Sequence, residues 1–112
     1  MELITPEIRE LLLANHDDES GDAKPVVKFF TPDANATWLI FSMDPEDNDL
    51  LFGLCDLGLG FPELGSVRLP ELLEVRGGMG LPVERDLHWE PKLSLNAYAS
   101  LAAARGQIVE PS

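Results

Sequence analysis

The stretch from Arg85 to Glu90 holds the side chains best suited to acid–base chemistry. If this stretch is a strand, Asp86, His88 and Glu90 share one face, because side chains alternate along a strand. A histidine flanked by carboxylates can serve as a general base. No nucleophile motif and no zinc-protease motif accompanies it, and polar alternation on an edge strand explains the same residues. We therefore predict no catalytic residue, and a small hydrolase-type enzyme using His88 with Asp86 or Glu90 is the third of three hypotheses.

Two acidic clusters are the stronger candidates for a site. One lies in a segment without apolar periodicity, and the other lies in a turn between two predicted strands. A charge run is most often a solvated surface, but it also suits docking to a basic protein. The residues predicted to bind a partner are Asp17, Asp18, Glu19, Asp44, Glu46, Asp47 and Asp49.

The sequence indicates neither a metal site nor a cofactor. Counted from Asp44, a calcium loop needs Gly at the sixth position and Glu at the twelfth, where this chain has Asp49 and Cys55. His16 beside the first acidic cluster is a single imidazole and a weak ligand set. Cys55 is the only cysteine, so no disulfide forms within the chain and Cys-based zinc sites are excluded. The glycine clusters lack the spacing of phosphate loops.

The net charge narrows the classes of partner. The chain has 112 residues, with 20 Asp and Glu against 8 Lys and Arg, and a formal charge of −12. Residues 1–23 hold seven acids and one base, and residues 44–74 hold eight acids and one base. Affinity for phosphate depends on Lys and Arg, so we expect no direct binding of nucleic acid or of anionic membranes. A basic protein surface fits the charge, and the sequence does not indicate an oligomeric state.

Length and patterning predict one domain over residues 1–112. The chain lacks a run of about 18 apolar residues, the length of a membrane-spanning helix. Its first residues, MELITPEIRE, carry acid where a secretory signal carries base, which predicts a cytoplasmic protein.

The predicted elements give an α+β fold, a small antiparallel sheet of three to five strands with an N-terminal and a C-terminal helix packed on one side of it. Thr5 and Ser94 are suited to cap the two helices, and Gly106 to end the second. Gly53 is predicted to mark a bulge or a close backbone contact. The predicted ranges are a helix over 5–15, a flexible acidic loop over 16–24, strands over 26–30, 37–43, 50–55 and 66–69, a short helix over 70–75, an edge strand over 81–89 and a helix over 94–105.

Two long stretches carry a family resemblance. PVVKFFTPDANATWLIFSMDPEDNDLLFGLCDLGLGFPELGSV and GLPVERDLHWEP are similar to a bacterial family of unknown function, domain of unknown function 2958, over roughly residues 8–106. Members are met on plasmids, integrative elements and phages. The resemblance implies a mobile-element context, in which small acidic proteins blunt host defences such as restriction or CRISPR, and it transfers no catalytic motif.

The leading hypothesis is thus a non-enzymatic acidic interaction protein that binds a basic surface, including that of a nucleic-acid-handling or host defence complex. Duplex DNA carries about one charge per 1.7 Å, so twelve excess charges match about 20 Å of duplex. A counter-defence inhibitor that mimics DNA is feasible if the two acidic segments share a face. The alternative is a structural or regulatory accessory module acting through the apolar Gly- and Pro-rich zone from Leu57 to Leu64, which requires Leu59 and Phe61 to be exposed.

Overall fold

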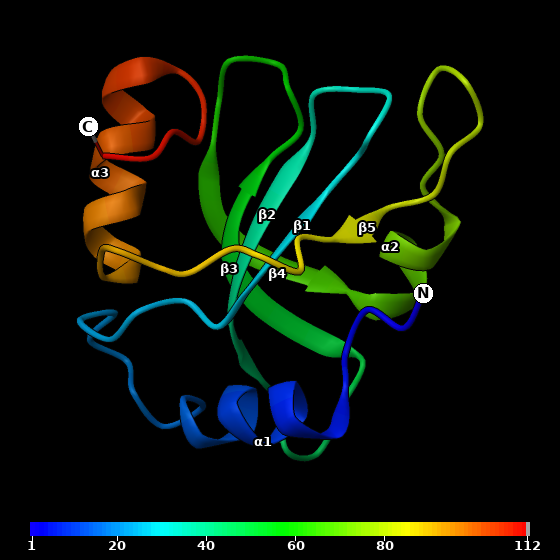
Figure 1. Ribbon diagram of the computed structural model, residues 1–112. Coiled ribbons are helices and arrows are strands. Elements are labelled where there is room, and N and C mark those ends of the chain that lie inside the picture. The colour runs from blue at the N-terminus through cyan, green and yellow to red at the C-terminus, as the bar shows by residue number, and fades with distance from the viewer. Residues whose placement is uncertain (112) are drawn as a thin grey trace.

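The computed structural model describes residues 1–111, in which an antiparallel sheet lies between helices (Figure 1). The predicted α+β class is confirmed. Within the described residues, no helix has both the length and the apolar character needed to cross a bilayer. The elements in chain order are α1 (Pro6–Ala14), β1 (Val27–Phe30), β2 (Thr37–Met43), β3 (Leu50–Asp56), β4 (Glu63–Arg68), α2 (Leu69–Glu74), β5 (Glu84–Arg85) and α3 (Leu95–Arg105).

The sheet has the strand order β4-β3-β2-β1-β5, and all neighbouring strands are antiparallel. The first four strands form a meander because short turns connect them. The chain then passes through α2 and returns to the far edge, where β5 pairs with the end of β1. One edge is therefore the six-residue strand β4, and the other edge is the two-residue strand β5.

Both faces of the sheet are covered, which corrects the expectation of helices on one side. Trp38 and Ile40 of β2 pack in a core cluster with residues of α1 and α2. Leu39 and Phe41 of the same strand pack in a second cluster with Leu95 and other residues of α3. Six of the seven residues of β2 are buried, as expected of a strand whose two faces are both covered. In Figure 1, α3 lies to the left of the sheet and α1 lies below it.

The predicted helix caps are present. The Thr5 hydroxyl accepts from the backbone N–H of Ile8 and starts α1, and the Ser94 hydroxyl accepts from Ala97 N–H and starts α3. Gly106 ends α3 with φ of 74°, a left-handed conformation that glycine adopts without steric cost.

Gly53 marks a close approach of two backbones, as predicted. A Cβ at this position would lie 2.1 Å from Leu39 O and 2.8 Å from Ile40 Cα of β2. The register of β2 against β3 shifts between Ile40 and Ser42, directly beside this contact. A side chain at position 53 would therefore push the two central strands apart.

Two predicted strands differ from the structure. β4 begins at Glu63 rather than residue 66, because the residues after Pro62 pair with β3 as far as Cys55. The edge strand expected over 81–89 is only Glu84–Arg85, apart from a single bridge between Arg76 and Pro82. Proline supplies no N–H for a ladder, which keeps this strand short.

The C-terminal segment turns back after α3 and is held by two carboxylates (Figure 1). Asp56 is buried, and its Oδ2 accepts from Ile108 N–H at 2.9 Å. Glu110 accepts from the Tyr98 hydroxyl at 2.7 Å and from Trp89 Nε1 at 2.9 Å. Burial raises the pKa of Tyr98 to about 12, and the hydrogen bond and charge of Glu110 add to this shift.

Candidate functional site

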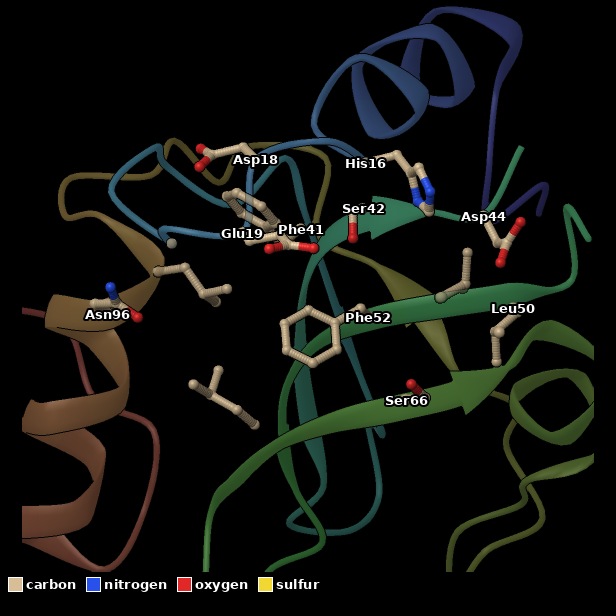
Figure 2. A pocket seen from close by; sticks show the side chains of 14 residues that line it. His16, Asp18, Glu19, Phe41, Ser42, Asp44, Leu50, Phe52, Ser66 and Asn96 are labelled. Atoms are coloured by element: carbon tan, nitrogen blue, oxygen red, sulfur yellow. The ribbon is translucent and has the colours of Figure 1, made fainter. Parts of the chain in front are cut away.

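An open groove of about 380 Å³ lies on the α3 face of the sheet, beside the N-terminus of α3 (Figure 2). It exists because α3 covers the part of this face around Leu39 and Leu54 and leaves the neighbouring part of β3 and β4 uncovered. Residues from five parts of the chain line it, namely His16, Asp18, Glu19, Gly21, Phe41, Ser42, Asp44, Leu50, Leu51, Phe52, Leu64, Ser66, Leu95 and Asn96.

The floor of the groove is apolar. Phe41, Leu51 and Leu95 are buried beneath it. Phe52 and Leu64, on adjacent strands, are 38 % and 42 % exposed and together leave apolar surface open to the groove. Figure 2 places the Phe52 ring between α3 and β4, next to Ser66. Apolar surface of this kind is a common feature of ligand and partner sites.

Carboxylates from both acidic segments lie on the rim. Asp18 and Glu19 come from the loop after α1, and Asp44 comes from the end of β2 (Figure 2). The lining contains neither Lys nor Arg. Hydrogen bonds from the side chain and backbone of Ser20 lower the pKa of Asp18, so this carboxylate stays ionised to a lower pH than an ordinary aspartate. The rim is thus negative over an apolar floor.

Local hydrogen bonds hold the rim in place. The backbone N–H of Leu95 donates to Ala23 O at 2.9 Å, and that of Asn96 donates to Gly21 O at 3.1 Å. The acidic loop after α1 is thereby attached to the N-terminus of α3. One oxygen of Asp44 accepts from the Glu46 N–H at 2.8 Å, which fixes the carboxylate at the start of the β2–β3 turn.

The other predicted partner-binding residues do not line the groove. Asp17, Glu46 and Asp49 are exposed and are not part of its lining. Asp47 forms an ion pair with Arg68, with 2.9 Å between Oδ2 and Nη1, and this contact lowers the pKa of Asp47. The structure therefore brings together Asp18, Glu19 and Asp44 and turns Asp47 toward the end of β4.

The interpretation of Asp86, His88 and Glu90 as one strand face was wrong. β5 ends at Arg85, and Asp86 Oδ1 accepts from the backbone N–H of His88 at 3.1 Å in a turn. The other oxygen of Asp86 lies 3.7 Å from Lys28 Nζ. All three residues border a shallow hollow, in which His88 and Glu90 are exposed. Asp86, one of the two carboxylates that could orient His88 as a base, instead faces Lys28.

The Gly- and Pro-rich zone from Leu57 to Leu64 is exposed. Leu59 is 74 % and Phe61 is 78 % exposed, and Leu57 is 61 % exposed. This is the condition that the accessory-module hypothesis required. The zone leads directly into β4, so it adjoins the groove through Leu64.

Two further kinds of site to consider are a reactive cysteine and a metal centre. Burial raises the pKa of the Cys55 thiol to about 11, which leaves very little thiolate at neutral pH. Among residues 1–111, no group of three or more His, Cys, Asp and Glu side chains is arranged to hold a metal ion.

Sequence reasoning found the rim but missed the floor. Leu64 was included in the apolar zone from Leu57, but Phe52 and Leu95 fit ordinary core positions, since period-two alternation places Phe52 and Leu54 on one face. No local pattern reveals that α3 covers Leu54 and leaves Phe52 open. The sequence signal that could have indicated the floor is the pattern of β4, where the apolar Leu64 lies between Glu63 and Gly65.

The fold and the groove define a small acidic α+β domain with an open apolar site rimmed by carboxylates. The model of the family described as "Protein of unknown function (DUF2958)" matches residues 3–109. The chain belongs to this family, which carries no evidence of catalysis, and the resemblance noted in the sequence is confirmed. Neither the curated proteins nor the solved structures include a match to this chain.

Proposed function

We propose that this protein is a non-enzymatic interaction protein whose groove binds a basic segment of a partner. The observation that supports the proposal most is that Asp18 and Glu19 share one rim with Asp44, although 24 residues or more separate these positions in the chain. The groove supplies apolar contact area, and the rim selects positive charge and excludes acidic competitors.

The class of partner follows from the same chemistry. A segment that offers Lys or Arg beside one or two apolar side chains satisfies both the rim and the floor. Basic surfaces of this kind occur on proteins that handle nucleic acids, and a host defence complex is the partner that a mobile-element setting suggests. Counter-defence, in the form of anti-restriction or anti-CRISPR inhibition, is the biological role that we propose for this binding.

A quantitative pull-down from the cells that express the protein tests the proposal. The test variant is D18N/E19Q/D44N, which removes the rim charges. The matched control is E2Q/E10Q/E90Q, which removes the same number of charges from exposed positions outside the groove. We expect the rim variant to lose the partner and the control to retain it. Equal retention by both variants would show that the groove is not the docking site.

A second candidate is an accessory module that acts through the exposed zone from Leu57 to Leu64. The exposure of Leu59 and Phe61 favours it, because large apolar patches mark interaction sites. The variant L59S/F61S separates the two candidates. Loss of the partner in this variant, with retention in the rim variant, would favour the accessory module.

A further inference from the structure

The long edge strand of the sheet, β4, has a hydrogen-bonding partner on one side only. Each of its residues from Glu63 to Arg68 is paired with a residue of β3, and no strand lies on its other side. Apart from the ladder with β3, the described residues make no backbone hydrogen bond to residues 63–68. An edge of this kind presents a row of free N–H and C=O groups that can pair with another strand.

β4 has few of the usual protections of an edge strand, apart from the charged residues at its two ends, Glu63 and Arg68. Its six residues include neither proline nor lysine. Its one base, Arg68, is drawn back toward the β2–β3 turn by the ion pair with Asp47. At its centre, no heavy atom lies within 4 Å of the position that a Cβ on Gly65 would take. A side chain of an added strand therefore meets open space beside Gly65, on the face of the sheet opposite the groove.

The two faces beside this edge differ in chemistry. Leu64 and Ser66 point into the groove, and Phe52 lies opposite Ser66 in register. On the other face are Glu63, by the alternation of the strand, and the exposed Glu71 of the following helix α2. An added strand would place alternate side chains on apolar surface and the intervening ones beside carboxylates.

The geometry points to β4 as the acceptor for an extended segment of the partner, which adds to the sheet as a sixth strand. That segment has apolar residues at every second position, facing Phe52 and Leu64, and basic residues between them, facing Glu63 and Glu71. Main-chain hydrogen bonds supply affinity in this mode of recognition, and side chains on alternate faces supply specificity. The inference rests on the proposed function and specifies how the partner segment lies at the same groove.

The test uses the whole protein and a synthetic probe, an end-blocked peptide of alternating valine and lysine long enough to span β4. Amide hydrogen exchange and backbone chemical shifts are followed by NMR with and without the peptide. Two further peptides keep every side chain but carry N-methyl groups on alternate residues, in the two possible phases. One phase blocks the N–H groups that would face β4, and the other blocks only the outward N–H groups. A peptide of alternating valine and glutamate controls for charge.

Strand addition predicts at least about tenfold slower exchange at alternate amides of β4, equivalent to about 1.4 kcal/mol of added protection. It also predicts that one N-methylated peptide fails to bind and the other binds. Shifts at Phe52 and Leu64 without protection of β4, with equal binding of both N-methylated peptides, would overturn strand addition and leave groove docking intact. Absence of binding by the unmodified peptide would also overturn it, while the pull-down with the rim variant decides the proposed function separately.

Discussion

Replacing Gly53 by alanine tests how the central strands fit together. The new Cβ would lie 2.1 Å from Leu39 O and 2.8 Å from Ile40 Cα. Both atoms belong to the backbone of β2, so no side-chain rotation relieves the contact, and β2 and β3 must separate. Overpacking of a well-packed interior costs about 1–3 kcal/mol, and we expect G53A to reach at least the upper end of this range.

Gly65 provides the matched control, because it lies directly opposite Gly53 in the β3–β4 register. A Cβ at Gly65 would meet no heavy atom within 4 Å. The same chemical change therefore lacks the steric cost, and reduced freedom of the unfolded chain favours G65A by up to about 1 kcal/mol.

Thermal and urea unfolding, followed by circular dichroism, measure the difference. At this chain length about 1 kcal/mol corresponds to roughly 4 °C, so G53A should melt about 12 °C or more below the wild type. G65A should melt at or slightly above the wild-type Tm. Equal melting temperatures for the two variants would refute the close approach of β2 and β3 at this position.

Three further predictions concern titratable and hydrogen-bonded groups. Cys55 should react with a disulfide reagent far more slowly in the folded protein than in urea at pH 8, since a pKa of about 11 leaves about one thiolate in a thousand; equal rates would contradict its burial. Tyr98, the only tyrosine, should ionise near pH 12 in ultraviolet titration; because its folded pKa lies above the usual 10, its contribution to stability is complete below pH 10 and is lost as pH rises toward 12. E110A should lower the free energy of unfolding by about 0.5–1.5 kcal/mol, because the Tyr98 hydroxyl and Trp89 Nε1 lose their acceptor, and it should also lower the pKa of Tyr98. Unchanged urea midpoints and an unchanged Tyr98 titration would show that Glu110 does not hold the C-terminal segment.

The elements that could be predicted from the sequence are those whose cause is local. Residues 37–43 form β2 with the predicted bounds, because an apolar run lies between two turns. α3 lies between Ser94, which caps its start with its side chain, and Gly106, which ends it through its backbone conformation. The close contact at Gly53 could be predicted because a glycine in the interior of a strand often marks a bulge or a close approach of two backbones.

The features that escaped prediction depend on tertiary packing. The apolar character of β2 in both directions favours coverage of both faces, but which helix covers which face follows from the path of the chain around the sheet. The turn at Asp86 replaced an expected strand because Asp86 caps the backbone of His88 and pairs with Lys28. The floor of the groove could not be predicted, because the position of the end of α3 decides which apolar residues stay exposed. No local sequence pattern sets that position.

The central claim is that one groove uses an acidic rim and an apolar floor to bind a basic partner segment. The most direct measurement is calorimetric titration of the purified partner into wild-type protein, D18N/E19Q/D44N and E2Q/E10Q/E90Q at several salt concentrations. We predict that the rim variant binds at least about tenfold more weakly, a loss of about 1.4 kcal/mol, with a clearly smaller dependence of Kd on salt. The control variant should match the wild type in both respects. Equal affinities and equal salt dependence for the rim variant and the control would contradict the claim.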